Sequence, residues 1–123
     1  MKHIKTGTRR GSFDLLAETR DAQAAMMTLP PGRASEATPG NEHPRSEQWL
    51  LVLAGTGEAT IGRRRGALRR VKLSKNSLLL IEKGDLHQIR NTGQRPLRTI
   101  NFYTPPAYDK DAEVRPAVKR KAR

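Results

Sequence analysis

The segment NSLLLIEKGDLHQIRN, residues 76–91, carries the strongest fold signal in this sequence. Its apolar run, Leu78–Ile81, has the length of a strand, and we expect all of it to lie in the core. Gly84, in the turn EKGD, can adopt the positive φ that such a turn needs. The alternating residues that follow predict another short strand. The segment therefore indicates a strand, a tight turn and a second strand.

Turn-forming residues recur about every 8–12 positions along the rest of the chain, and long stretches with a helical period are absent. This spacing predicts an all-β sandwich or barrel built from short strands. Asp21–Met27 also contains the alanines of a short helix, but sheet context can override that preference, and we assign it to a strand. The predicted strands are Ser12–Ala17, Gln23–Leu29, Glu47–Leu53, Glu58–Ile61, Leu68–Leu73, Ser77–Ile81, His87–Arg90 and Leu97–Tyr103.

Composition limits the classes of protein to which this chain can belong. Its 123 residues suggest one domain, and the absence of cysteine excludes disulfides and thiolate metal sites. No apolar run approaches the ~20 residues of a membrane-spanning helix. The basic start of the chain is not followed by the apolar segment of a secretory signal. We therefore expect a cytoplasmic protein that makes no membrane contact.

The net charge of +12 is concentrated in two places. Arg63, Arg64 and Arg65 begin a basic cluster that predicts an anion-attracting surface, and the end of the chain is also basic. Such charge attracts nucleic acid, but aromatic side chains for base stacking are scarce, so nucleic acid is an unfavoured alternative ligand. These features divide the chain into a basic arm at residues 1–11, a barrel at 12–108 and a basic, partly disordered tail at 109–123.

The opening segment resembles the second conserved motif of the cupin superfamily. That motif reads glycine, five residues, proline, one residue, glycine, two residues, histidine, three residues, asparagine. The corresponding positions are Asn76, Glu82, Gly84, His87 and Asn91, with every interval kept. Asn76 replaces the glycine and Glu82 the proline; asparagine tolerates the left-handed conformation better than most residues. Asn91, before a threonine and a glycine, is expected to close the following turn.

An earlier stretch, HPRSEQWLLVLAG, resembles the first cupin motif. That motif reads histidine, one residue, histidine, three or four residues, glutamate, six residues, glycine. Counting back six residues from Gly55 places Gln48 at the glutamate position. His43 is the one histidine of the stretch, and Arg45 stands where the second histidine is expected. The match to the first motif is therefore partial.

The resemblance implies a small single-domain jelly-roll barrel, or double-stranded β-helix, of two antiparallel sheets that forms a homodimer. It also implies a divalent iron, manganese, nickel, copper or zinc ion, held in the barrel mouth by three histidines and a glutamate. Carried over residue by residue, the metal ligands are His43, Gln48 and His87. Imidazole suits several of these metals, so the ligands do not select one. Gln48 is neutral, so a carboxylate such as Glu42 or Glu47, or the substrate, would have to supply charge.

Strand parity bears on which of these side chains face the pocket. In a regular strand, His43 and Gln48 point to opposite faces. A bulge or another irregularity near Pro44 would turn His43 inward. Arg45, if it faces inward, would hold a carboxylate or phosphate rather than a metal. Tyr103, at the end of the last predicted strand, is a further pocket-lining residue that could donate a hydrogen bond.

Three functions follow from these features. The one we prefer is a metal-dependent enzyme of the dioxygenase or isomerase type, acting on a small oxygenated or anionic substrate. The second is a metal-free cupin that binds a small molecule through Arg45, Gln48 and His87 without catalysis. The third is binding of nucleic acid through the basic cluster and tail. In each case Trp49 is expected on the outer sheet face or at a dimer contact.

Overall fold

The computed structural model describes residues 1–63 and 65–109, so Arg64 and the predicted tail from residue 110 onward lie outside the described residues. The elements in chain order are η1 (Thr6–Thr8), β1 (Phe13–Glu18), β2 (Gln23–Leu29), β3 (Glu47–Ala54), β4 (Gly57–Gly62), β5 (Leu68–Leu73), β6 (Leu78–Ile81), β7 (Leu86–Asn91) and β8 (Leu97–Thr104). Every strand predicted from the sequence is present, and β2 and β5 have the predicted bounds. No helix in this part of the chain is long and apolar enough to cross a membrane.

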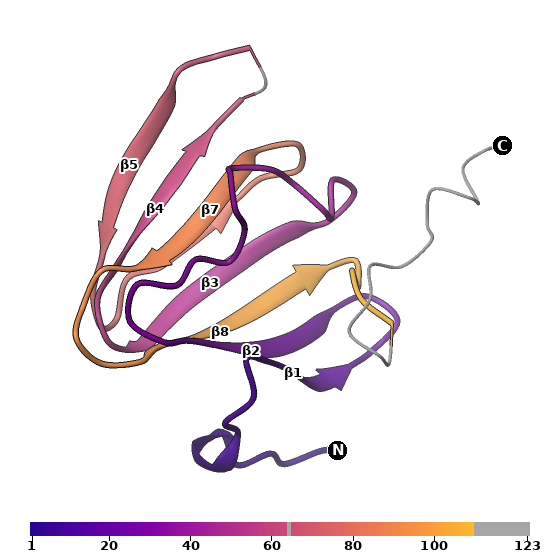
Figure 1. Ribbon diagram of the computed structural model, residues 1–123. Coiled ribbons are helices and arrows are strands. Elements are labelled where there is room, and N and C mark those ends of the chain that lie inside the picture. The colour runs from indigo at the N-terminus through magenta and orange to yellow at the C-terminus, as the bar shows by residue number, and fades with distance from the viewer. Residues whose placement is uncertain (64, 110–123) are drawn as a thin grey trace, which may run out of the picture.

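The strands form two antiparallel sheets that face each other (Figure 1). The larger sheet has the strand order β1-β2-β8-β3-β6, and the smaller sheet has the order β5-β4-β7. After β3 the chain changes sheet at each connection except the β4–β5 hairpin. These crossings tie the two sheets together, as in a jelly-roll barrel. The prediction of two antiparallel sheets is confirmed.

The apolar core lies between the inner faces of the two sheets. On β3, Leu50 and Val52 point inward and are fully buried, because alternate residues of a strand share a face. They belong to one cluster with Ala59, Leu73 and Ile89 from the facing sheet. Burial of an aliphatic side chain contributes about 1.5–3 kcal/mol relative to leaving it exposed. This cluster therefore holds the two sheets together.

The expectation that the whole run Leu78–Ile81 lies in the core is wrong. Ile81 is fully buried, but Leu78 and Leu80 are 62% and 38% exposed. The run forms β6, the edge strand of the larger sheet, and its side chains alternate between the inner and outer faces. A continuous apolar run supplies residues to both faces of a sheet, so it does not show that both faces are covered.

The turns around β6 and β7 have the geometry expected from the sequence. Asn76 adopts a φ of 76°, and Gly84 adopts a φ of 86°. The side chain of Asn91 accepts a hydrogen bond at 2.8 Å from the backbone nitrogen of Gly93, which closes the turn before β8. Asparagine therefore fills the first position of the motif in the left-handed conformation that glycine would otherwise supply.

A buried glutamine fastens the segment after β8 across the end of the larger sheet. The Nε2 group of Gln23 donates to the carbonyl of Tyr108 at 2.8 Å. Its Oε1 atom accepts from the backbone nitrogens of Ala107 and Tyr108, both at 3.0 Å. Because this amide is 2% exposed and fully paired, it fixes the position of the Tyr108 ring beside Phe13.

Candidate functional site

The loop between β2 and β3, residues 30–46, runs along β7, the edge strand of the smaller sheet. A main-chain bridge joins Gly40 to His87, and Gln88 donates through Nε2 to the carbonyl of Glu36 at 2.8 Å. The loop is thus held as an additional edge of that sheet, although its sequence has no strand pattern. This attachment brings its carboxyl side chains next to the inner face of the barrel.

A cavity of about 390 Å³ lies between this loop and the larger sheet. Its lining contains both apolar and polar side chains. The apolar side chains are Phe13, Met27, Leu29 and Ile89 among others. The polar side chains, called here the polar wall, include Glu36, Glu42, Gln48, His87, Tyr103 and Tyr108. The two sets adjoin, since the ring centroids of Phe13 and Tyr108 lie 4.9 Å apart. A concave site with a few converging polar groups on an apolar background is the usual form of a small-molecule site.

His43 lies in a turn immediately before β3 and is 4% exposed. Its backbone nitrogen donates to Oδ1 of Asn41 at 2.8 Å, and its carbonyl accepts from the backbone nitrogen of Ser46 at 3.0 Å. This turn directs the ring inward, where its centroid lies 5.0 Å from that of His87. Strand parity, which would point His43 outward, applies only from Glu47 onward because the strand begins there.

The two histidines are held in the neutral form. Burial lowers the pKa of His43 and the pKa of His87 below their ordinary value, because it disfavours the charged imidazolium. The Nδ1 atom of His87 lies 3.2 Å from the carbonyl oxygen of Asp85. Since a carbonyl only accepts, Nδ1 of the neutral ring carries the hydrogen. The Nε2 atom of His87 is therefore an acceptor with a free lone pair.

Two tyrosines complete the polar wall. The Tyr103 ring centroid lies 5.1 Å from that of His43 and 5.1 Å from that of Tyr108. The hydroxyl of Tyr108 donates to Oε1 of Glu42 at 3.0 Å. Burial raises the pKa of Tyr103 and of Tyr108 far above their ordinary value, so both remain protonated at neutral pH. The Tyr108 hydroxyl therefore acts as a donor to the Glu42 carboxylate.

Several acceptors at the cavity have no hydrogen-bond partner within the described residues. Burial, with a smaller effect of Glu42, raises the pKa of Glu36 to about 7, and its buried Oε1 atom is unpaired. Gln48 donates through Nε2 to Oδ1 of Asn101 at 2.9 Å, and its buried Oε1 atom has no partner at hydrogen-bonding distance. The Gln48 side chain nevertheless acts on the neighbouring His43 ring, whose pKa it raises by less than burial lowers it. The Nδ1 atom of His43 is unpaired too, but His43 does not line the cavity. Buried polar atoms are normally paired, so the unpaired Oε1 atoms of Glu36 and Gln48 in the lining of one cavity point to a bound ligand.

The structure brings together most, but not all, of the residues selected from the sequence. His43, Gln48 and His87 converge, and Glu42 and Tyr103 line the same cavity. Two other residues do not line it. Arg45 is exposed at the surface, outside the cavity lining. Glu47 points to the outer face of the sheet, where its Oε1 atom accepts from Nε1 of Trp49 at 3.1 Å.

Sequence reasoning missed Glu36 and the polar inner face of β8. Glu36 lies in a loop with no periodic pattern, and no sequence signal distinguishes it from exposed glutamates. On β8 a signal existed: inward positions alternate as Leu97, Thr99, Asn101 and Tyr103, all buried. Polar residues at inward positions of a strand indicate a lined cavity rather than a packed core. They also pair with each other, since Asn101 donates to Oγ1 of Thr99 at 3.0 Å.

The basic cluster lies on the β4–β5 hairpin, which projects from the barrel (Figure 1). Arg63 is not a free cation there, because its Nε atom lies 2.9 Å from Oδ1 of Asp85 and its Nη2 atom 3.9 Å from Oε1 of Glu82. Arg65 is exposed, and Arg64 lies outside the described residues. Of the three predicted anion-attracting arginines, Arg63 is therefore partly neutralised by neighbouring carboxylates.

The donor set does not fit the metal centre that the resemblance implies. That centre needs three histidines and a carboxylate, whereas no three histidine, aspartate or glutamate side chains converge among residues 1–63 and 65–109. The converging ligands are two neutral imidazoles and the neutral amide of Gln48. Such a set leaves the charge of a divalent ion uncompensated and falls short of the usual ligand number of a protein metal site.

Comparison with known proteins gives the same architecture. A family model described as Cupin domain matches residues 25–103. The protein BH2720 of Bacillus halodurans is 28% identical, with a TM-score of 0.76 over 85% of this chain and 77% of that chain. KdgF of Halomonas sp. is 22% identical, with a TM-score of 0.62 over 76% of this chain and 77% of that chain. A search of the curated proteins found no match.

A third similar solved structure is described by its fold. The protein mj0764 of Methanocaldococcus jannaschii, an RmlC-like cupin family protein with a double-stranded β-helix fold, is 16% identical. Its TM-score is 0.63 over 84% of this chain and 87% of that chain. The predicted fold class, a double-stranded β-helix of two antiparallel sheets, is thereby confirmed.

Proposed function

We propose that this chain, which belongs to the cupin family, binds a small, neutral, hydroxyl-rich molecule in its barrel cavity without a bound metal. One observation carries the proposal. The unpaired buried acceptors Glu36 Oε1 and Gln48 Oε1 belong to residues that line the same cavity. A buried acceptor without a partner costs about 1–3 kcal/mol, and a ligand hydroxyl would remove that cost.

The chemistry of the polar wall selects the ligand class. Gln48 Oε1, His87 Nε2 and the carboxyl groups of Glu36 and Glu42 all accept hydrogen bonds. A ligand that matches them must present several donors, as the hydroxyl groups of a polyol or a sugar do. The apolar side chains of the lining, Phe13 among them, suit the carbon–hydrogen face of such a molecule.

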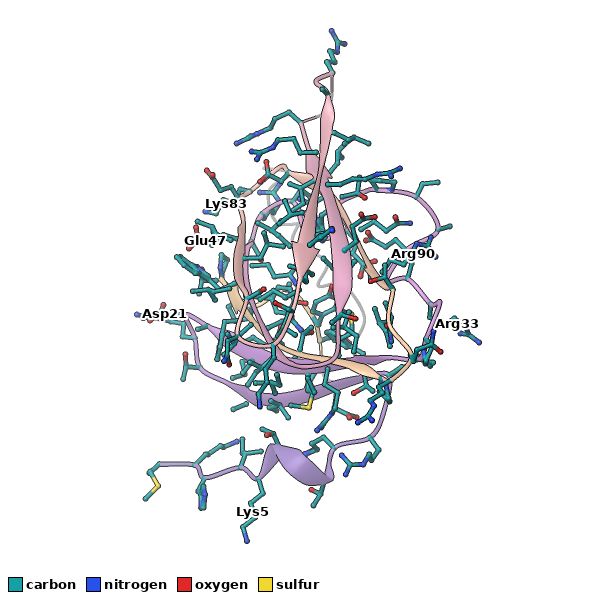
Figure 2. The ribbon with its side chains drawn as sticks, turned by 90° about the vertical axis from the view of Figure 1, so that its left-hand side faces the viewer. Lys5, Asp21, Arg33, Glu47, Lys83 and Arg90 are labelled. Atoms are coloured by element: carbon teal, nitrogen blue, oxygen red, sulfur yellow. The ribbon has the colours of Figure 1, made fainter. Side chains whose placement is uncertain are left out.

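The same wall disfavours an anionic ligand. Two carboxyl groups, Glu36 and Glu42, face the cavity, and Glu42 contributes to the raised pKa of Glu36. Arg45, the cation expected to hold an anion, lies exposed outside the cavity. Arg33 belongs to the rim of the cavity but is exposed and points outward (Figure 2). An anion would therefore meet more negative than positive charge inside the site.

The proposal is tested with protein purified without a histidine tag and treated with a chelator. Thermal-shift screening and calorimetry should show stabilisation by neutral polyols or monosaccharides, and less by matched carboxylates and sugar phosphates. Gln48→Leu and Glu36→Leu should each weaken binding about tenfold, since each removes one acceptor worth roughly 1.4 kcal/mol. Glu58→Leu, on β4 away from the cavity lining, is the matched control and should bind like the wild type.

Two outcomes would contradict the proposal. Equal binding by the wild type, Gln48→Leu and Glu36→Leu would place the ligand elsewhere. Stoichiometric loading with a divalent metal, lost in His87→Ala, together with stabilisation by metals alone, would instead support the metal-dependent function preferred from the sequence.

A further inference from the structure

The outer face of the smaller sheet is basic. Glu58 of β4 lies in register between Lys72 of β5 and Arg90 of β7. The next outward residue of β4, a threonine, is paired with Arg70 of β5. Ala59, between these two positions of β4, is fully buried in the core, so the rows on either side of it point outward. The basic face, as defined by this register, consists of Arg70, Lys72 and Arg90.

The positive charge of the basic face is not compensated within the described residues. Arg70 and Lys72 are exposed and belong to none of the ion pairs in this part of the chain. Arg90 is also exposed, and its Nη1 atom donates to the carbonyl of Gly32 at 3.1 Å, which holds the side chain but leaves its charge. Glu58 is the single carboxylate at the outward positions of the three strands, and it forms no ion pair there. The face therefore attracts anions.

Arg33 extends this charge beyond the sheet. It is exposed and lies in the loop that is bridged to β7 at Arg90. Figure 2 shows Arg33 and Arg90 on one side of the molecule, whereas Asp21, Glu47 and Lys83 lie on the opposite side. The labelled carboxylates are thus remote from the basic face, so an anionic partner is directed to the side that bears the two arginines.

The side chains of this sheet select the kind of anion. Protein interfaces are centred on aromatic and apolar side chains, and a membrane surface takes an inserted apolar face. Among the described residues, Leu68 is the single large apolar side chain exposed on the smaller sheet. Its strands β4, β5 and β7 contain no aromatic residue on which unpaired bases could stack. A duplex stacks its bases internally and presents phosphates, which arginine and lysine contact. The scarcity of aromatic residues therefore argues against single strands and not against a duplex.

We propose that the basic face binds the phosphate backbone of a nucleic acid duplex without reading its base sequence. Arg70 and Lys72 are two positions apart on β5, which separates them by about 6.8 Å. Phosphates of one strand follow each other at about 3.4 Å along the duplex axis, so side chains at this spacing reach separate phosphates. Glu58, between the rows, repels the backbone and weakens binding. None of the three cations lines the cavity, so the inference is independent of the ligand proposed there.

Fluorescence anisotropy with the whole chain and short labelled duplexes of DNA and of RNA tests the proposal over a series of salt concentrations. Both duplexes should bind, and more tightly than a single strand of the same length. Arg70→Gln combined with Lys72→Gln should weaken duplex binding about tenfold, and the slope of log K against log salt should become less negative by about 1.8. Lys2→Gln combined with Lys5→Gln removes the same charge from exposed positions of the N-terminal arm. This matched control should keep the affinity and slope of the wild type.

Glu58→Gln is a second variant with the opposite expected effect. It removes the repelling carboxylate and should tighten duplex binding about two- to fivefold, the size of one exposed charge interaction. A gain in affinity cannot arise from misfolding, so this variant decides the matter if the paired substitution on β5 is unstable. A wild type that does not bind a duplex at low salt would overturn the proposal. Equal losses in the two paired variants would show that only net charge matters, and tighter binding of polyglutamate than of a duplex would assign the face to an acidic protein.

Discussion

Asn91 and Gln48 are both buried amides, but they lie at opposite ends of the barrel and differ in their hydrogen bonding. Asn91, at the last position of β7, donates to two backbone carbonyls at 2.8 Å and accepts from the backbone nitrogen of Gly93 at 2.8 Å. Gln48, near the start of β3, donates to Asn101, while its Oε1 atom has no partner among the described residues.

This difference separates the part of the barrel that maintains the fold from the part available for binding. At the Asn91 end, the apolar cluster around Leu50 and Val52 fills the space between the sheets, and the buried amide is fully paired. At the Gln48 end, polar groups surround a cavity and some remain unpaired. Substitutions at the first end should therefore change stability, and substitutions at the second should mainly change binding.

The largest effect is expected for Leu50→Ala in the apolar cluster. Leu50 is fully buried, so its truncation loses apolar burial and leaves a cavity, at a cost of about 2–5 kcal/mol. Urea denaturation followed by circular dichroism measures the change in the free energy of unfolding. Leu68→Ala, at an exposed leucine of β5, is the control and should change it by less than about 0.5 kcal/mol. A similar cost for both variants would contradict the placement of the core.

Removal of the side-chain amide should lower the free energy of unfolding more at Asn91 than at Gln48. Asn91→Ala leaves two carbonyls and one backbone nitrogen without their partner and should cost about 2 kcal/mol or more. Gln48→Leu removes an amide that is only partly satisfied and replaces it with an apolar group of similar size. Its free energy of unfolding should stay within about 1 kcal/mol of the wild type. Equal destabilisation by the two variants would remove the distinction between the two ends.

The sequence was sufficient to predict the strands and the turns at the Asn91 end, but not which apolar residues form the core. There, side chains alternate regularly, and turns are set by residues with special backbone freedom, such as Asn76 and Gly84, which both adopt positive φ. The same alternation explains the error over Leu78–Ile81. An apolar run does not reveal that its outward residues lie on an edge strand without cover from the same chain.

The Gln48 end was less predictable because much of it is built from loops. His43 faces inward because of a turn formed with Asn41 and Ser46, and no strand rule applies to that turn. Glu36 reaches the cavity because its loop is attached to β7 by long-range hydrogen bonds such as that from Gln88. Contacts between segments so far apart in the chain leave no local pattern in the sequence.

The smallest expected effect is the dependence of stability on pH, and the groups that cause it lie at the Gln48 end. The pKa of Glu36 rises from 4.5 to about 7 in the folded protein. The folded state therefore binds this proton more tightly than the unfolded state, so the stabilisation is present at low pH and is lost as pH rises from 4.5 through about 7. Burial lowers the pKa of His43 and the pKa of His87, and this has the opposite effect on the pH dependence of stability. The contribution of the two histidines is lost as pH falls below 6.5.

Because these contributions oppose each other, the wild-type profile alone does not isolate Glu36. The difference in the free energy of unfolding between the wild type and Glu36→Gln does, since both proteins contain the two histidines. The free energy of unfolding of the wild type minus that of Glu36→Gln should decrease as pH rises from 4.5 to about 7 and then level off. Glu36 is only half-buried, so water screens the effect and the change should be about 1 kcal/mol or less.

Urea denaturation at a series of pH values measures this change, with Glu58→Gln as the matched control. A difference that increases with pH over this range would mean that the Glu36 carboxylate is stabilised in the cavity, as it would be beside a bound cation, and would contradict the metal-free site.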